Sequence, residues 1–251
     1  VLLLVLPTLH SDTAISYYTS LFWDNPEKEK DALVALRNYY WKNLQNSSNR
    51  PDARKIWLSG YITVSDENSY DNQLIQILEN RLIIEDLTID QDIRWNILQK
   101  LSSGNLPNIK DIIQREKMSD KSQRGKDSAL SCEAANSSEE NKKRFLSILA
   151  KPESEYSNTS LRLISISLFP IGQKKLQSKF SAEIYSNLNK IEKYRDESFI
   201  GVYVKSLIPS NCDEKSMGQI RNYLLNSQNI RPSLKKSLML LSDIEKSCIE
   251  V

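Results

Sequence analysis

Apolar and polar residues follow a helical period along most of this chain. The pattern is clearest in residues 87–101, where Ile93, Ile97 and Leu101 recur at positions i, i+4 and i+8. This spacing places side chains on one face of an α-helix. Trp95 lies in the same stretch and is large enough to anchor the helix against a neighbour. We therefore expect a helix here with one buried face.

Helix-start residues divide the rest of the chain into similar segments. Ser, Asp and Asn side chains accept hydrogen bonds from the free N–H groups of a first turn, and Pro fits that turn because it lacks an N–H. Such residues precede helical apolar rows at Ser11 or Asp12, Pro26, Pro51, Ser69, Asp90 or Asp92, Pro107, Ser128, Ser137 or Ser138, Asp213 and Pro232. The pattern predicts about thirteen helices with short polar connections. In the last helix, the predicted inner row is Leu234, Leu238, Leu241 and Ile244.

One segment leaves its secondary structure open. Residues 161–168 are densely apolar and partly alternating, so periodicity alone does not exclude a short strand. Helical patterns flank the segment on both sides, and this context favours a buried helix.

The predicted helices form pairs that recur every roughly 35 to 45 residues, the period of HEAT-like arrays. The expected fold class is all-α, with paired antiparallel helices in a HEAT- or armadillo-like superhelical array. We expect residues 1–251 to form a single helical-repeat domain. The apolar run Val1–Leu6 lacks an initiator Met and a basic flank, so we expect it to continue a helix of a longer protein from which this piece is excised.

Composition narrows the function classes. Apolar residues make up 39% and charged residues 26% of the 251 residues, which is typical of a folded, soluble chain. The net charge is +2 with both signs interspersed, so a nucleic-acid partner is not predicted. No run approaches the roughly 20 apolar residues of a membrane span, so we expect no membrane-spanning segment.

The cysteines bear on the compartment. Cys132, Cys212 and Cys248 are odd in number and far apart. This pattern argues against a disulfide framework and favours buried thiols in a reducing compartment. We therefore predict a cytoplasmic protein.

Three Asn-x-Ser/Thr sequons begin at Asn46, Asn136 and Asn158. Sequons are acceptors for N-linked glycans only in a chain that enters a glycosylating compartment. Because this chain is rich in Asn and Ser, chance occurrence is the preferred interpretation.

Catalytic and metal-binding patterns are absent from the sequence. The single histidine, His10, has no partner at metal-ligand or triad spacing. Asp86, Asp90 and Asp92 form the densest acidic group but lack the glycine and terminal glutamate of a calcium loop, so helix-start solvation explains them better. Gly125-Lys126 lacks the upstream glycine of a phosphate loop. We predict no catalytic residue and no metal ligand in this chain, and the substrate-binding residues are unknown.

Three blocks of sequence carry a family resemblance. The first comprises residues 84–87 and 92–101, with Arg94-Trp95 at its centre. The second runs from Asp120 and Gly125 through the small residues Ala129, Ala134 and Ala135 to Ser138-Glu139-Glu140-Asn141-Lys142, Lys143 and Phe145. The third comprises residues 180–185, Ile191, Arg195 and residues 207–209. Together they resemble the C-terminal helical domain of the aminopeptidase N family of zinc aminopeptidases, over roughly Asp31 to Ser242. Family members usually carry Trp directly after the position of Ile191, where this chain has Glu192.

The resemblance implies a supporting role in a peptidase. In that family the zinc motif, His-Glu-x-x-His with a further Glu, and the Gly-x-Met-Glu-Asn motif lie in an earlier domain, and neither occurs here. The chain itself would hold no cofactor, and zinc would belong to the catalytic domain of the parent. The implied partners are that preceding domain and peptide substrates. The implied function is to cover the catalytic domain and to shape or gate the peptide cavity.

A second hypothesis belongs to a different class of protein. A free-standing helical-repeat scaffold could bind a protein partner through a concave face without any enzyme attached. The two hypotheses differ in whether a zinc-dependent aminopeptidase domain accompanies this chain.

Overall fold

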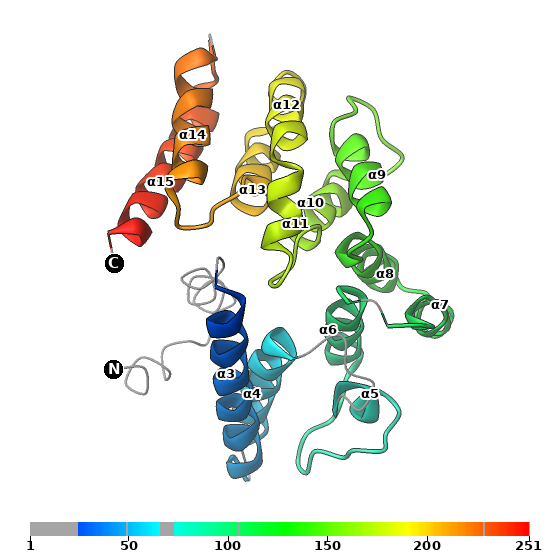
Figure 1. The fold of residues 1–251 in the computed structure, drawn as a ribbon. Coiled ribbons are helices and arrows are strands. Elements are labelled where there is room, and N and C mark those ends of the chain that lie inside the picture. Colours follow the sequence, from blue (N-terminus) through cyan, green and yellow to red (C-terminus); the bar gives the residue numbers. More distant parts are fainter. Residues whose placement is uncertain (1–24, 49, 66–72, 105, 228, 251) are drawn as a thin grey trace. The chain divides into compact units, whose positions relative to one another are not determined.

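The computed structural model describes residues 25–48, 50–65, 73–104, 106–227 and 229–250. Within these residues the chain is all-α: thirteen helices are present and no strand occurs (Figure 1). The predicted fold class is confirmed at this level. The predicted helix after Ser11 or Asp12, the run Val1–Leu6 and His10 lie outside the described residues.

The chain divides into two compact units, Val1–Cys132 and Glu133–Val251, referred to below as unit 1 and unit 2. Unit 1 contains α3 (Pro26–Asn46), α4 (Pro51–Val64), α5 (Gln73–Leu78), α6 (Gln91–Ser102) and α7 (Ile109–Ser119). The next helix, α8 (Gln123–Ala135), spans the boundary. Unit 2 contains α9 (Glu139–Leu149), α10 (Asn158–Ser167), α11 (Lys174–Lys179), α12 (Ser181–Ile191), α13 (Glu197–Leu207), α14 (Glu214–Asn226) and α15 (Pro232–Ile249). That the whole chain behaves as a single domain stays a prediction.

Helices α3 and α4 form the first hairpin of unit 1. Both begin with proline in the first turn, as predicted, and Asn25 caps α3 by accepting a 3.1 Å hydrogen bond from the Lys28 N–H. The aromatic ring of Tyr40 is 1% exposed and packs beside Trp57 of α4. At Gly60 of α4 a Cβ atom would overlap the Tyr40 ring. The absence of a side chain therefore allows the two helices to approach closely.

Helix α6 is central to the rest of unit 1, because it contacts α4, α5 and α7. Its predicted apolar face is buried: Ile93, Ile97 and Leu101 are at most 4% exposed. Trp95 is 3% exposed and is the buried anchor that the sequence predicts. The helix begins after Asp90, whose side chain accepts the Ile93 N–H at 2.9 Å.

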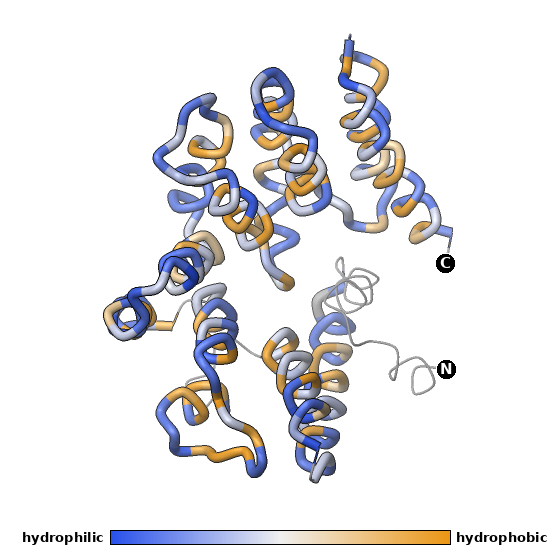
Figure 2. Tube along the Cα trace, turned by 180° about the vertical axis from the view of Figure 1, so that it is seen from behind, coloured by the Kyte–Doolittle hydropathy of each residue, from blue (hydrophilic) through white to orange (hydrophobic). Residues whose placement is uncertain are grey.

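Unit 2 is built from successive helix pairs. Helix α9 contacts α10, and α14 contacts α15. The second helices of the pairs also pack on one another, α10 on α13 and α13 on α15, and α9 packs on α12. Figure 2 shows apolar and polar positions alternating around these helices, as expected when each has one buried face. Each pair therefore covers an apolar side of the next, the packing principle of helical-repeat proteins.

The segment 161–168, whose secondary structure the sequence left undecided, is helical. Residues 161–167 belong to α10, and Leu161, Ile164 and Leu168 are fully buried. The strand alternative is therefore wrong. A strand would have left the polar groups of this segment to find partners in a sheet, and the surrounding helices offer none.

The inner row of α15 differs from the prediction at one position. Leu234, Leu238 and Leu241 are buried as expected, but Ile244 is 46% exposed and Glu245 is 0% exposed. The buried row continues at Glu245, seven residues after Leu238, and at Cys248, seven residues after Leu241. Which residues are buried follows the i, i+3, i+4, i+7 geometry of the helix rather than the hydrophobicity of each residue.

The structure overturns the prediction that the cysteines are unpaired. Cys212, in the connection before α14, and Cys248, near the end of α15, form a disulfide with a Cα–Cα distance of 5.2 Å. The packing of α15 brings together two residues that are 36 positions apart. Closing a loop of this length stabilises a fold by about 3–4 kcal/mol in the chain-entropy account. Cys132 is a buried thiol in α8 and is not part of the disulfide.

No helix in the described part of the chain is both long enough and apolar enough to cross a membrane.

The close contact at Gly60 yields a prediction. Gly60→Ala should lower the free energy of unfolding by about 1–3 kcal/mol, because the buried Tyr40 ring must move to admit the methyl group. Gly201→Ala in α13 is the matched control: its Cβ meets nothing within 4 Å, and the change should stabilise by roughly 0.5–1 kcal/mol. Denaturant titrations followed by circular dichroism measure both variants. Equal effects in the two would contradict the packing argument.

Candidate functional site: buried polar side chains at helix ends

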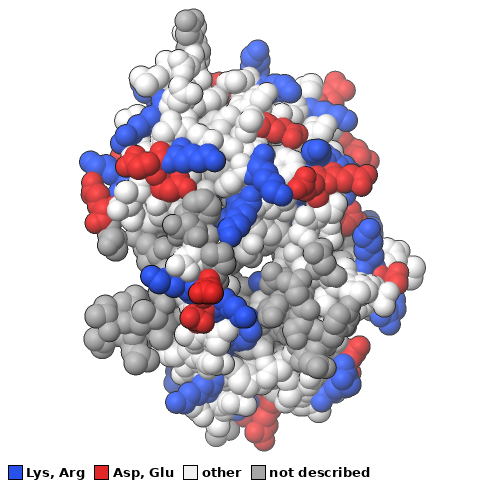
Figure 3. All heavy atoms as spheres, in the orientation of Figure 1, with Lys and Arg blue, Asp and Glu red and all other residues white. Residues whose placement is uncertain are grey.

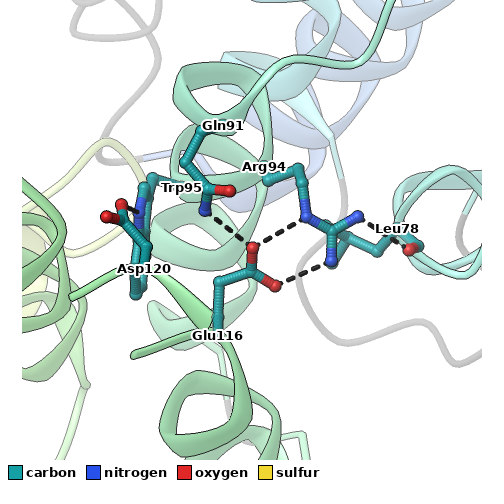
Figure 4. Close-up of polar contacts among 6 residues, drawn as sticks. All are labelled: Leu78, Gln91, Arg94, Trp95, Glu116 and Asp120. Atoms are coloured by element: carbon teal, nitrogen blue, oxygen red, sulfur yellow. Dashed lines mark hydrogen bonds and ion pairs between the residues drawn. The ribbon is translucent and has the colours of Figure 1, made fainter. Parts of the chain in front are cut away.

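An ion pair joins α6 and α7 in unit 1. Arg94 of α6 donates from Nε to Oε1 of Glu116 at 2.8 Å and from Nη2 to Oε2 at 2.7 Å (Figure 4). Gln91, one turn before Arg94 on α6, donates to the same Oε1 at 2.7 Å. Glu116 is only 7% exposed. A paired, nearly parallel geometry of this kind is the strongest form of carboxylate–guanidinium contact.

Arg94 also connects this cluster to α5. Its Nη1 donates to the backbone carbonyl of Leu78, the last residue of α5, at 3.0 Å. The Arg94 hydrogen bonds are the largest cause that holds the pKa of Glu116 below its usual range. Both carboxylate oxygens of Glu116 therefore have donors within the protein. The cluster holds three helices together and leaves its carboxylate no free oxygen for a ligand.

Trp95 anchors the same helix through a second contact. Its indole Nε1 donates to Oδ2 of Asp120 at 2.8 Å, while Oδ1 accepts the Ser122 hydroxyl at 2.6 Å. These bonds, with that from Ser122 the largest, keep the pKa of Asp120 low. A Cβ atom at Gly125 would lie 2.5 Å from the Asp120 carbonyl oxygen. Close packing therefore joins Trp95, Asp120 and Gly125, and position 125 must lack a side chain because Asp120 occupies that space.

Unit 2 contains a fully buried cation. Lys142 of α9 is 0% exposed, and its Nζ donates to Ala134 O at 2.9 Å, to Ala135 O at 3.2 Å and to Leu168 O. The first two carbonyls end α8, and Leu168 is the C-cap of α10. The Phe169 ring lies 5.2 Å from the ammonium. The cation thus sits at the negative ends of two helix dipoles, where it satisfies carbonyls that have no partner in their own helix.

Burial and these acceptors act on Lys142 in opposite directions. Burial lowers the pKa of Lys142 to about 7, because a desolvated ammonium is unfavourable. The three carbonyl oxygens favour the charged form. A lysine that is shielded from solvent and surrounded by acceptors is not available as a nucleophile, so its role is to join α8, α9 and α10.

The same arrangement recurs at other helix ends. A side-chain donor reaches the final carbonyls of a neighbouring helix in both units. These contacts are Arg37 Nε to Val64 O at 3.3 Å, Arg54 Nε to Ser47 O at 3.0 Å, Gln177 Nε2 to Leu207 O at 3.0 Å, and Arg195 Nη2 to Lys151 O at 2.7 Å. Most of the buried basic groups therefore serve helix termination.

The position where the chain departs from the aminopeptidase pattern also has a structural partner. Glu192, the C-cap of α12, accepts the backbone N–H of Arg231 at 2.5 Å. Arg231 is the N-cap residue of α15 and donates from Nη1 to Arg195 O at 2.8 Å. The glutamate thus ties the turn after α12 to the start of α15, a role that an indole at this position could not fill.

Glu245 is the most unusual carboxylate in unit 2. It is 0% exposed, and its Oε1 accepts the Ser210 hydroxyl at 2.5 Å and the Cys212 N–H at 3.3 Å. Oε2 has no hydrogen-bond partner among the described residues. Because Cys212 is disulfide-bonded to Cys248 one turn further along α15, Glu245 fixes the loop that carries the disulfide.

The acidic group singled out in the sequence is used at a helix start. Asp90 caps α6 and pairs with Lys55 at 2.7 Å, and these two contacts lower its pKa, the bond from Lys55 being the larger cause. Asp92 pairs with Arg124 at 2.8 Å. Asp86 has a left-handed backbone (φ 54°) in the preceding connection. Asp90 and Asp92 therefore lie at a helix start, as predicted, whereas Asp86 lies in the connection before it.

Metal ligands and surface charge are the remaining features of the described residues. Among the described residues, no three His, Cys, Asp or Glu side chains converge to hold a metal ion. Lys and Arg alternate with Asp and Glu over the face drawn in Figure 3. That this chain holds no catalytic residue and no metal ligand stays a prediction, and the substrate-binding residues stay unknown.

Sequence reasoning missed the buried Lys142 and Glu245, although a signal existed. Lys142 stands at i, i+3, i+4 and i+7 with Phe145, Leu146 and Leu149, all 0% exposed, and therefore on the inner face of α9. Glu245 has the same relation to the inner row of α15. A charged residue in register with an apolar row predicts a buried charge, provided that acceptors or donors lie opposite, which the sequence does not reveal.

Most of the chain matches a known protein family. The family described as the ERAP1-like C-terminal domain matches residues 12–241 of the chain. The match confirms the resemblance to the C-terminal domain of the aminopeptidase family, and it begins earlier than the predicted Asp31. No curated protein matches the chain.

The Arg94–Glu116 pair yields a prediction on acid stability. Glu116→Gln should lower the free energy of unfolding by about 2–3 kcal/mol at pH 7, because Arg94 loses its counter-charge. Since the folded pKa of Glu116 lies below the unfolded value of about 4.3, its contribution is complete above that pH and is lost as the pH falls through the folded pKa. The difference between wild type and variant should therefore shrink only in acid.

Tryptophan fluorescence measures this effect in unit 1, since every tryptophan precedes residue 132. Glu79→Gln is the control, because Glu79 pairs with Arg81 at the surface with both side chains more than half exposed. It should change stability by less than about 0.5 kcal/mol. A pH-independent gap for Glu116→Gln would contradict the assigned pKa direction.

Lys142 yields a prediction with the same pH sign as Glu116 but in a higher pH window. An unfolded lysine keeps its proton to about pH 10.4, whereas the folded pKa is about 7. The unfolded state therefore binds more protons between these values, and stability should rise with pH across this window by at most about 1.4 kcal/mol per unit. Lys142→Met should remove this rise and, at pH 6, destabilise by about 2–4 kcal/mol by leaving buried carbonyls unpaired.

The control for Lys142 is Lys179→Met. Lys179 is 67% exposed in its side chain and pairs with Glu139 at 3.0 Å, so its loss should leave the pH profile unchanged. Denaturant unfolding followed by circular dichroism between pH 6 and pH 9 distinguishes the variants. If Lys142→Met retained the wild-type pH slope, Lys142 would not be its source.

Proposed function

The chain belongs to the ERAP1-like C-terminal domain family, and on this premise we propose that it is the non-catalytic C-terminal domain of a zinc-dependent aminopeptidase. Such an enzyme removes the N-terminal residue of a peptide. The observation that carries the proposal is the family match over residues 12–241, most of the chain.

The polar chemistry of the chain supports a non-catalytic role. The buried charged groups Arg94, Glu116 and Lys142 are engaged with helix ends or with one another. The described residues do not fit a zinc site, because no suitable ligand group converges. Zinc would therefore be held by the preceding domain of the parent, where it lowers the pKa of a bound water for attack on the peptide bond.

The contribution of this chain is mechanical. A stack of helix pairs offers an extended surface whose rigidity comes from contacts between neighbouring pairs. In the proposed enzyme this surface covers the catalytic domain, encloses the peptide cavity and, by opening and closing, limits which peptides enter. The buried donors at helix ends would keep the pairs in register while the domain moves as a body.

Activity assays test the proposal. We expect the isolated chain to release no amino acid from fluorogenic aminoacyl substrates at any zinc concentration, while the parent polypeptide is active and loses activity to a chelator. Peptidase activity of the isolated chain would overturn the non-catalytic assignment. A parent polypeptide without any zinc-dependent aminopeptidase activity would instead favour the free-standing protein-binding scaffold.

A further inference from the structure

We propose that Asn46 and Asn158 carry N-linked glycans and that the chain folds in an oxidising, glycosylating compartment. This inference goes beyond the proposed function and does not rest on it. It replaces the sequence-based expectation of a cytoplasmic protein, which depended on unpaired cysteines.

The first observation is the disulfide. Cys212 and Cys248 are paired, and the surrounding loop is organised for that pairing: Cys212 adopts a left-handed backbone (φ 57°), and its N–H is held by Glu245. Disulfides persist in secreted and endoplasmic-reticulum proteins and are rare in the cytosol, where thiols are kept reduced. The same oxidising route exposes a nascent chain to N-glycosylation, so the sequons acquire a meaning that their sequence alone did not give.

The second observation is where the sequon asparagines lie. Asn46 is the last residue of α3 and is exposed, and Ser48 of the sequon is exposed in the turn that follows. Ser47 turns its hydroxyl back to Asn43 O at 2.7 Å and away from the Asn46 amide. A bulky, solvated glycan at Asn46 would leave the α3–α4 hairpin unaltered.

Asn158 is also exposed but lies at the start of a helix, and Ser160 of its sequon is buried. Asn158 is the first residue of α10. The capping role belongs to its neighbour Ser157, which accepts the Ser160 N–H at 3.1 Å, so modification of the Asn158 amide leaves the cap intact.

The third sequon has a different environment. Asn136 is partly buried between α8 and α9, and its Oδ1 accepts the Ser138 N–H at 3.1 Å. Ser138 in turn caps α9. A glycan on Asn136 would crowd this packed turn, so we assign glycans to Asn46 and Asn158 only.

The modification is a glycosyl transfer. The side-chain amide nitrogen of Asn attacks C1 of an oligosaccharide held as a lipid-linked glycosyl diphosphate. A C1–N bond forms, the C1–O bond to the diphosphate breaks, the amide gives up one proton to a base of the transferase, and the lipid diphosphate leaves.

Mass spectrometry of the full-length protein from the cells that make it tests the proposal. Peptide N-glycosidase in H₂¹⁸O converts a glycosylated Asn into ¹⁸O-labelled Asp. Trypsin, which does not cleave before proline, separates the three sequons into peptides 43–54, 127–142 and 145–162, so each is scored independently. Isotope-labelled synthetic standards of the three peptides make an undetected peptide distinguishable from an unmodified one. A parallel non-reduced digest shows whether the peptides with Cys212 and Cys248 are cross-linked.

We expect ¹⁸O-Asp at positions 46 and 158, an unmodified Asn136, and a cross-linked cysteine pair. Unlabelled Asn at either position 46 or 158 overturns the assignment of that site, and label at 136 overturns the burial argument. Unmodified sequons together with free thiols overturn the compartment. None of these results bears on peptidase activity, so failure here and failure of the proposed function are distinguishable.

Discussion

A helix that ends against other helices must find hydrogen-bond donors for its last carbonyl groups, and this requirement shapes the interior of the protein. Each helix leaves up to four carbonyls without a partner of their own, and those that are buried against other helices need donors from elsewhere in the protein. Arg94 reaches Leu78 O, Lys142 reaches Ala134, Ala135 and Leu168, and Arg195 reaches Lys151. Long donors thus hold the end of a neighbouring helix.

This constraint explains why several charged side chains are buried in the described part of the chain. Glu116, with donors on both oxygens, and Lys142, with three acceptors, act as joints between helices. Such joints give a stack of helices a fixed geometry. The chain belongs to the ERAP1-like C-terminal domain family.

A disulfide is the second kind of connection, and it links the segment before α14 to the end of α15. The Cys212–Cys248 bond and the buried Glu245 act on the same connection before α14, one covalently and one by hydrogen bonds. The pairing also changes the compartment in which the chain is expected to fold. Cysteine number and spacing favoured unpaired thiols, and that prediction was wrong because spacing along a chain says nothing of distance in a fold.

By itself the sequence determined the all-α class, most helix starts and the buried face of α6, because caps, prolines and the i, i+4 spacing act within a few residues. It also carried the family resemblance. Only the tertiary structure decided which polar residues are buried, since Lys142 and Glu245 are stable inside only where carbonyls or donors from distant segments meet them. The disulfide and the Arg94–Glu116 pair belong to the same class: each joins residues more than 20 positions apart, beyond the reach of any local pattern.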